Sequence, residues 1–194
     1  MNKKIILMGG YCATGKTTFA KLLSQKFSVP YFSKDFTKIA LNRSISVKNR
    51  DDSKKLSAAA FDAMAYTGER LMEVGLPLIM EANFVMHPNH GGIKEGEALQ
   101  RLIEAYSYTS FTYIFVGDTT CLYKRHAARD TLPERGVANK MWGEYTIENY
   151  IKDNLHLADF NVGGTGDIVR VDTTDFASVD YEGLTKIAHE FLIS

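Results

Sequence analysis

Residues 10–17, which read GYCATGKT, match the pattern G-x-x-x-x-G-K-[S/T] at every fixed position. In this pattern the glycines let the backbone turn tightly, so that consecutive N–H groups point at phosphate oxygens. A helix that begins directly after the loop adds a partial positive charge at the same point. Lys16 is placed to reach the β- and γ-phosphates, and the Thr17 hydroxyl is placed to ligate Mg²⁺. The pattern therefore predicts that this loop binds a nucleoside triphosphate.

The expected nucleotide contacts extend over the whole loop and into the start of the next helix. They come from Gly10, Cys12, Ala13, Thr14, Gly15, Lys16, Thr17 and Thr18. The alternative is a glycine-rich turn that holds no ligand, but an apolar run before the loop and a helical pattern after it favour nucleotide binding. We also expect the thiol of Cys12 to ionise readily beside the positive helix end, although it could simply be a small residue that fits.

Two acidic residues follow predicted strands and could complete the chemistry of phosphoryl transfer. Asp35 comes after the second strand and Glu81 ends the third, so both are expected at the carboxyl edge of the sheet, where the loop also lies. Asp35 would activate or position an acceptor hydroxyl, or else cap the following helix, a role that Ser33 could equally fill. Glu81 would contact Mg²⁺ or its water, or else be a carboxylate satisfied by its neighbours. Asn83 could bind the acceptor or turn the chain.

A basic helical stretch in the second half of the chain could supply cations to the reaction. Arg125 and Arg129 are four residues apart and therefore share a helix face. Guanidinium groups stabilise the charge that develops on the transferred phosphoryl group, and a mobile arginine-bearing lid excludes competing water. Arg135 follows in a segment without a clear pattern. The alternative is a solvated basic face that pairs with acids such as Asp130.

The elements that must position these residues alternate along the chain. Short apolar runs predict strands at residues 5–8, 29–32, 78–80, 112–116 and 168–171. Apolar residues at helical spacing predict helices at residues 17–27, 52–74, 96–107, 120–130 and 181–193. Strands with nearly continuous apolar character, separated by helices, indicate an α/β fold with a parallel sheet covered on both faces.

Composition limits the classes of protein that fit. The chain has 194 residues, so a single domain is expected. Its 23 Lys and Arg balance 23 Asp and Glu, so a domain-wide basic surface for nucleic acid is not expected. No apolar run is long enough to span a membrane. Cys12 and Cys121 do not form a disulfide framework in a chain of this size. We therefore expect a cytoplasmic protein, either a monomer or a homodimer.

Two further groups have simpler interpretations than a site. The spacing of His87 and His90 would allow a metal pair, but no clear third ligand accompanies them, which favours a surface loop. Trp142, Tyr145 and Tyr150 are best explained as a packing stripe of a helix.

Taken together, the motifs resemble the small P-loop kinases of the nucleoside-monophosphate, shikimate and gluconate kinase type. More narrowly, they resemble the zeta-toxin and chloramphenicol-phosphotransferase-like group. The resemblance is carried by residues 10–17, 33–35, 77–83, Arg125 with Arg129, and residues 171–174, which occur in the expected order over nearly the whole chain. Residues 172–175 could flank the nucleotide base or form an ordinary capped turn.

This resemblance implies a three-layer P-loop NTPase fold, with a five-stranded parallel sheet in the order 2-3-1-4-5 and a helical lid. It implies one domain over residues 1–194, with an acceptor-binding helical region at about 35–75 and a lid at about 120–142. Carried over, Lys16 and Thr17 hold nucleotide and Mg²⁺, Asp35 activates the acceptor, and Arg125 and Arg129 are lid cations. Two features depart from the family: the cations after the acid are Lys38 and Arg43 rather than a nearby arginine, and Glu81 stands where aspartate is common.

The resulting hypothesis is a Mg²⁺-dependent enzyme that moves the γ-phosphoryl group of ATP to a hydroxyl of a small molecule. Two alternatives stay open at this point. One is a nucleotide-binding regulatory ATPase that phosphorylates no acceptor. The other is a kinase of nucleic-acid 5′-hydroxyl groups, against which the zero net charge counts.

Overall fold

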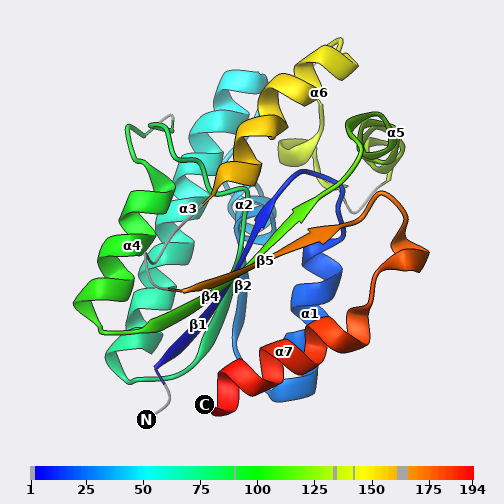
Figure 1. The fold of residues 1–194 in the computed structure, drawn as a ribbon. Coiled ribbons are helices and arrows are strands. Elements are labelled where there is room, and N and C mark those ends of the chain that lie inside the picture. Colours follow the sequence, from blue (N-terminus) through cyan, green and yellow to red (C-terminus); the bar gives the residue numbers. More distant parts are fainter. Residues whose placement is uncertain (1–2, 90, 133–134, 142, 161–165) are drawn as a thin grey trace.

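The computed structural model describes residues 3–89, 91–132, 135–141, 143–160 and 166–194. A parallel sheet forms its centre (Figure 1), built from β1 (Lys4–Gly10), β2 (Tyr31–Ser33), β3 (Leu78–Glu81), β4 (Thr109–Val116) and β5 (Asp167–Asp172). The strands lie in the order β2-β3-β1-β4-β5, which confirms the predicted order. Each predicted strand is present, with ends that differ by a few residues.

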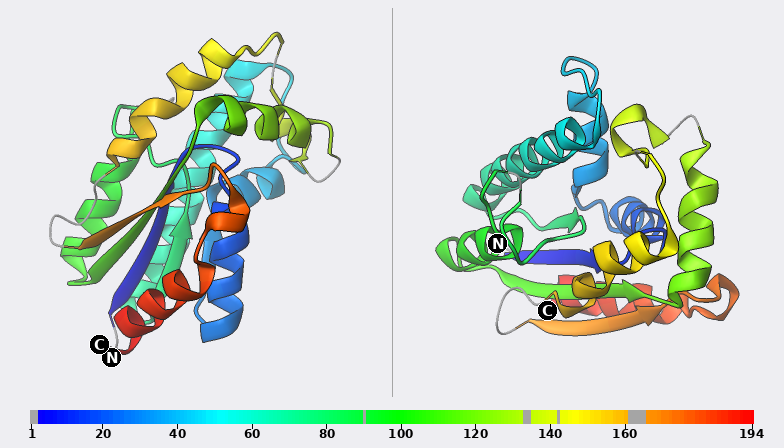
Figure 2. Two further views of the ribbon diagram at one scale, coloured as in Figure 1. Left: turned by 45° about the vertical axis from the view of Figure 1, so that its right-hand side comes forward. Right: turned by 90° about the horizontal axis from the view of Figure 1, so that it is seen from above.

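Helices lie on both faces of this sheet and beyond its carboxyl edge. They are α1 (Lys16–Phe27), α2 (Lys34–Leu41), α3 (Arg50–Glu73), α4 (Glu95–Ala105), α5 (Thr119–Asp130), α6 (Ile147–Asn154) and α7 (Tyr181–Ile193). Short 3₁₀ turns are η2 (Val137–Asn139), η3 (Leu155–Asp159) and η4 (Phe176–Ser178). Helices α3 and α4 cover one face, α1 and α7 cover the other, and α5 and α6 lie beyond the strand ends (Figures 1 and 2). The α/β class and the layered arrangement are therefore confirmed.

The position of β1 at the centre of a sheet covered on both faces explains why its sequence is apolar without interruption. Ile5 and Leu7 belong to the core cluster between the sheet and helices α3 and α4. Ile6 and Met8, which point to the opposite face, belong to the cluster that includes residues of α1 and α7. All four side chains are fully buried. A strand covered on both faces has no solvated side on which a polar residue could be placed.

The register of the sheet brings three strand ends to one level. Glu81, the last residue of β3, pairs with Met8 of β1 on one side and with Ser33 of β2 on the other. The loop that leaves β1 and the helix that follows β2 therefore start beside the Glu81 carboxylate. The candidate residues of these three segments meet because of this register.

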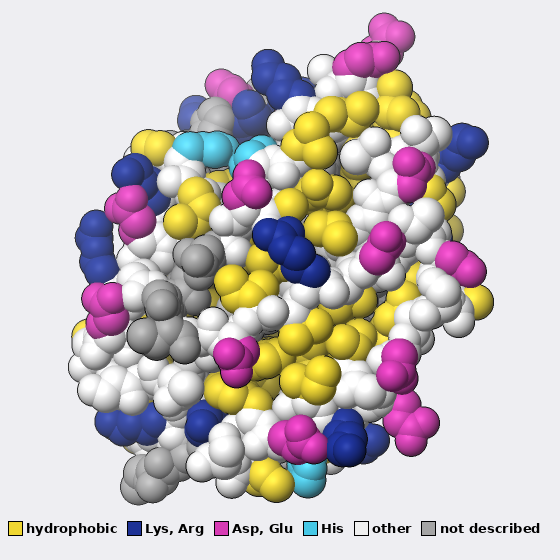
Figure 3. Space-filling view, in the orientation of Figure 1, with side chains coloured by type: hydrophobic (Ala, Val, Ile, Leu, Met, Phe, Trp, Pro, Cys, Tyr) yellow, Lys and Arg dark blue, Asp and Glu magenta, His cyan; other side chains and the backbone are white. Residues whose placement is uncertain are grey.

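The surface carries both signs of charge. On the face drawn in Figure 3, Lys and Arg are interspersed with Asp and Glu, in keeping with the zero net charge of the chain. Within the residues that the structure describes, no helix is both long enough and apolar enough to cross a membrane.

Candidate functional site

The loop over residues 10–17 connects β1 to α1 and is shaped by two glycines with positive φ. Gly10 has φ of 107°, and a Cβ at this position would collide with the backbone carbonyl of Phe115. Gly15 has φ of 83° and directly precedes α1, whose N-terminus has no side-chain cap. The first N–H groups of α1 therefore remain available, which is the arrangement that an anion at a helix N-terminus requires. All eight residues predicted to contact nucleotide lie on this loop or in the first turn of α1.

Lys16 is buried inside the loop. Its ammonium donates to the carbonyl oxygens of Gly10, at 3.2 Å, and of Tyr11. Its exposed fraction is 6%, and burial lowers the pKa of its ammonium although the carboxylates of Glu81 and Asp35 oppose this shift. A buried cation is more stable when an anion joins it. The loop thus presents a desolvated positive charge to whatever occupies it.

Glu81 lies beside Lys16 in a cluster of hydroxyl donors. Its Oε2 accepts hydrogen bonds from Ser33 Oγ at 2.6 Å, Tyr31 OH at 3.2 Å and Thr17 Oγ1 at 3.3 Å. Burial raises the pKa of this carboxyl, against the opposing effect of Lys16. The hydroxyl of Ser33 is therefore engaged by Glu81 and does not cap α2, as the sequence had suggested it could.

The oxygen donors of this cluster suit a hard divalent cation. Thr17 and Glu81 are the predicted metal residues, and their side-chain oxygens are hydrogen-bonded to each other. Mg²⁺ is usually held in such sites by one or two protein oxygens together with phosphates and water. Among the described residues no group of three or more His, Cys, Asp or Glu could hold a metal ion.

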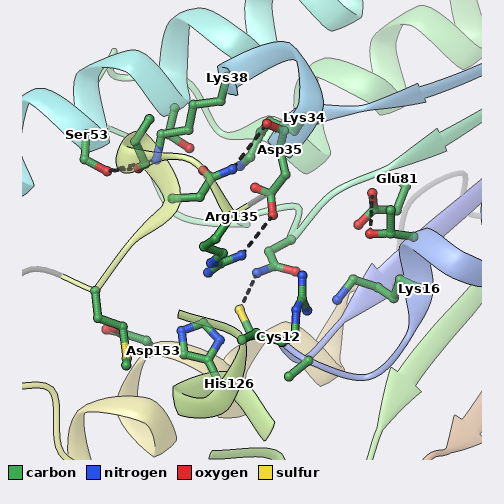
Figure 4. A pocket seen from close by; sticks show the side chains of 18 of the residues that line it. Cys12, Lys16, Lys34, Asp35, Lys38, Ser53, Glu81, His126, Arg135 and Asp153 are labelled. Atoms are coloured by element: carbon green, nitrogen blue, oxygen red, sulfur yellow. Dashed lines mark hydrogen bonds and ion pairs between the residues drawn. The ribbon is translucent and has the colours of Figure 1, made fainter. Parts of the chain in front are cut away.

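Asp35 lies in the first turn of α2, and its side chain is half exposed. The nearest cation is Arg135, whose Nη1 is 3.9 Å from the Asp35 carboxylate. Figure 4 shows Asp35 and Arg135 facing one another, with Lys16 and Glu81 to one side. The segment after α5 also contacts α2 here, since Asn139 donates to the backbone carbonyl of Asp35 at 3.3 Å. Arg135 therefore lies closer to the candidate catalytic carboxylate than its sequence segment, which has no clear pattern, indicated.

Arg125 and Arg129 both lie on α5 and line the same cavity, but their surroundings differ. Arg125 donates to the carbonyl oxygens of Thr173 and Thr174, and its guanidinium lies 4.0 Å from the ring centroid of Phe176. Arg129 forms no ion pair with any residue that the structure describes. Arg129 is thus the freer of the two predicted lid cations.

These side chains converge on one cavity of about 1110 Å³. Its lining includes Lys16, Thr17, Asp35, Glu81, Arg125 and Arg129. The volume is slightly above the range of about 300–1,000 Å³ that is usual for small-molecule sites, so it is larger than a single compact ligand needs. The structure therefore brings the predicted catalytic, nucleotide and metal residues together, with additional space beside them.

Helix α6 contacts the loop, which the sequence did not indicate. Asn154 Oδ1 accepts a hydrogen bond from the backbone N–H of Cys12 at 2.7 Å, and Tyr150 OH donates to the carbonyl of Cys12 at 2.7 Å. Asn154 also donates to the Tyr150 carbonyl at 2.8 Å, and both side chains are buried. Side chains of helix α6 thus bind both the backbone N–H and the backbone carbonyl of Cys12 in the loop. Cys12 and Asn154 are 142 positions apart in the sequence, and no periodic signal links them from which this contact could be found.

The thiol of Cys12 is not the ionised group that we expected. Asn83 Nδ2 donates to Cys12 Sγ at 2.9 Å, which accounts for one role of that asparagine. Burial is the largest influence and raises the pKa of the thiol, outweighing the nearby Lys16. The expectation of a readily ionised thiol was wrong because it considered the helix end and neglected desolvation.

Removing the Tyr150 hydroxyl tests the contact between α6 and the loop. We expect Tyr150→Phe to weaken binding of an ATP analogue about fivefold, because one hydrogen bond that fixes the loop contributes about 1 kcal/mol. Tyr123→Phe is the matched control, since its hydroxyl donates to the Tyr145 carbonyl and its ring contacts Tyr150. Calorimetric titration of both variants gives the comparison. Equal affinities in the two variants would show that α6 does not position the loop.

The remaining candidates that the structure describes have structural partners. The rings of His87 and His156 lie 5.2 Å apart, while His90 and Trp142 lie outside the described residues. The carboxylate of Asp172 accepts hydrogen bonds from the backbone N–H and the hydroxyl of Thr174, so residues 172–175 form a capped turn. Arg125 donates to the Thr174 carbonyl of this turn.

Comparison with known proteins rests on structure alone. No family model and no curated protein matches the sequence. A structure from Chloroflexus aurantiacus, described provisionally as a kinase, superposes with a TM-score of 0.85 at 22% identity over 99% of this chain and 100% of the other. A Sinorhizobium meliloti gluconokinase gives a TM-score of 0.54 at 15% identity, covering 99% and 93%. The Mycobacterium tuberculosis APS kinase, in complex with AMPPNP and APS, gives 0.57 at 13% identity, covering 100% and 99%. The chain has the fold of the small P-loop kinases.

Proposed function

We propose that this protein is an ATP- and Mg²⁺-dependent phosphotransferase that moves the γ-phosphoryl group to a hydroxyl of a small-molecule acceptor. The observation that carries the proposal is that Lys16 and Asp35 line the same cavity. A half-exposed carboxylate opposite a phosphate-binding loop is the group that a kinase needs and that a simple nucleotide binder does not. The likeness in fold to proteins described as kinases supports it.

In the proposed reaction, Asp35 accepts the proton of the acceptor hydroxyl, or orients that hydroxyl for attack. The hydroxyl oxygen forms a bond to the γ-phosphorus while the bond from phosphorus to the β–γ bridging oxygen breaks, and ADP leaves. Lys16 and Arg129 offset the negative charge on the transferring group. Arg125 can contribute only after exchanging its contacts with the Thr173 and Thr174 carbonyls for phosphate oxygens.

The metal ion would be held by Thr17 and Glu81 together with the nucleotide. When bound, Mg²⁺ neutralises phosphate charge. The hydroxyls of Ser33 and Tyr31 orient the Glu81 carboxylate by hydrogen bonding, so they act as positioning groups for that ligand.

In this proposal the regions on the two sides of the cavity have separate tasks. Residues at about 35–75 hold the acceptor, and residues at about 120–142 act as a lid that excludes water from the transferred group. Contacts between η2 and helix α2, such as that of Asn139 with Asp35, are then the point at which lid and acceptor region meet.

A metabolite screen tests the proposal directly. The protein is incubated with a cell extract, Mg²⁺ and ATP whose γ-phosphate carries heavy oxygen, and mass spectrometry identifies molecules that gain the labelled phosphoryl group. We expect one small class of hydroxylated compounds to gain it, and Lys16→Ala, run in parallel, to yield none.

The same screen separates the alternatives. If labelled inorganic phosphate is the sole product, the protein is an ATPase without an acceptor and the proposal fails. Transfer to nucleic-acid 5′-hydroxyl groups that weakens steeply with salt would instead indicate a polynucleotide substrate.

A further inference from the structure

Two further cations, Lys38 and Arg135, line the cavity on the side of the proposed acceptor region. Lys38, on α2, is 7% exposed, and its ammonium donates to Ser53 Oγ at 2.9 Å. That hydroxyl donates in turn to the carbonyl of Ala138 at 2.8 Å. No carboxylate of a described residue lies within ion-pair distance of Lys38. One neutral hydroxyl is thus its nearest polar partner, although an ammonium has three N–H groups to donate.

Arg135 is the second of these cations, and its side chain is 12% exposed. Its Nε is buried and has no hydrogen-bond partner among the residues that the structure describes. The nearest carboxylate oxygens, of Asp130 at 3.7 Å and Asp35 at 3.9 Å, are too far for direct hydrogen bonds. A buried guanidinium nitrogen of this kind is costly unless another group completes its hydrogen bonding.

Two other cations that line the same cavity have carboxylate partners. Lys34 forms a buried ion pair with Glu95 at 2.9 Å, and Arg50 pairs with Asp153 at 3.1 Å. Burial lowers the pKa of the Lys38 ammonium to about 8, and the positive charges of Lys34 and Arg135 add to this while Asp35 opposes it. In the free protein the Lys38 ammonium therefore has no carboxylate partner among the described residues, and the Arg135 guanidinium has two carboxylates within ion-pair distance but an Nε that lacks a hydrogen bond.

We infer that the acceptor carries an oxyanion, a phosphate, sulfate or carboxylate group, which Lys38 and Arg135 bind. In Figure 4, Lys38 and Lys16 lie on opposite sides of the cavity with Asp35 and Arg135 between them. An acceptor anchored by its oxyanion at Lys38 would extend its hydroxyl toward Asp35 and the phosphate-binding loop. The inference rests on the proposed function, and it narrows the acceptor to anionic hydroxyl compounds.

Sulfate is a suitable probe once the phosphate-binding loop is filled. The full-length protein is saturated with Mg²⁺ and AMPPNP, and sodium sulfate is titrated at constant ionic strength in a calorimeter. We expect sulfate to bind, Lys38→Met to weaken its binding roughly 10- to 100-fold, and Lys38→Arg to retain it within a few-fold, because charge-assisted hydrogen bonds are the strong ones. Lys54→Met is the matched control, since Lys54 is an exposed lysine lining the same cavity, and it should bind sulfate as the wild type does.

A second variant keeps the test decisive if Lys38→Met does not fold. Arg135→Gln removes a side chain whose Nε has no partner, so it should fold, and it should also weaken sulfate binding. Absence of sulfate binding to the AMPPNP complex, or unchanged binding in the folded Lys38 or Arg135 variants, would overturn the inference.

Acceptor pairs separate this inference from the proposed function. Hydroxyl compounds are compared with their phosphorylated, sulfated or carboxylated counterparts as acceptors of the labelled phosphoryl group. Equal efficiency with the neutral members would contradict the anion site and leave the kinase activity standing. Sulfate binding through Lys38 without transfer to any alcohol would support the anion site and contradict the kinase.

Discussion

Replacing Lys16 with alanine is expected to weaken binding of AMPPNP by about 100-fold or more. The buried ammonium reaches toward the position of the β- and γ-phosphates, and each charge-assisted hydrogen bond contributes about 1.5–3 kcal/mol, so two such bonds give at least two orders of magnitude. Its present hydrogen-bond partners are neutral groups of the loop, two backbone carbonyls and the Thr14 hydroxyl, which cannot neutralise its charge. Calorimetric titration with AMPPNP and Mg²⁺ measures the loss.

The same substitution should leave the fold intact. Because burial lowers the pKa of Lys16, the folded protein disfavours its charge relative to the unfolded chain, and removing it should not reduce the free energy of unfolding through electrostatics. Lys26→Ala, an exposed position in the last turn of α1, is the control and should bind AMPPNP normally. Retention of wild-type affinity by folded Lys16→Ala would contradict the assignment of the loop.

Much of the fold could be predicted because its determinants are local. The unbroken apolar run at Ile5–Met8 follows from a strand buried on both faces, and the glycines of the loop follow from backbone geometry. The 2-3-1-4-5 strand order, in contrast, came from the resemblance to known kinases, and the structure confirms it. Periodicity does not specify which strands become neighbours.

The features that could not be predicted depend on distant contacts or on desolvation. Asn154 and Tyr150 are ordinary residues in a short helix until the fold brings them to Cys12. The pKa of the Cys12 thiol depends on burial that no linear pattern shows. Arg135 lies in a segment without periodicity, and only the tertiary structure places it opposite Asp35.

The zero net charge of the chain conceals an uneven distribution. Lys and Arg outnumber Asp and Glu among the residues that line the cavity, while the remainder of the chain carries the compensating acids. Phosphates of a nucleotide account for cations around the loop, but Lys38 lies on the other side of Asp35. A single anionic ligand at the loop would leave part of this charge unused, which supports the inference that the acceptor is anionic as well as the nucleotide.

Asp35→Asn is expected to keep nucleotide affinity within about twofold and to reduce phosphoryl transfer by about 10²- to 10⁴-fold. Asparagine has nearly the same shape as aspartate, but its amide cannot accept the proton of an acceptor hydroxyl. The loop binds the nucleotide through other groups. Among the described residues the Asp35 side chain forms no hydrogen bond that holds the fold together, and its ion pair with Arg135 spans 3.9 Å.

Rapid-quench measurement of labelled product from the acceptor that the screen identifies gives the transfer rate, and titration with AMPPNP gives the affinity. Asp51→Asn, an exposed carboxylate in the first turn of α3, is the control and should transfer at the wild-type rate. Undiminished transfer by Asp35→Asn would remove Asp35 from the reaction and leave the charge-stabilising groups as the source of catalysis. Loss of nucleotide affinity in that variant would show instead that Asp35 acts on the nucleotide rather than on the acceptor, because a group that activates only the acceptor has no effect on AMPPNP binding.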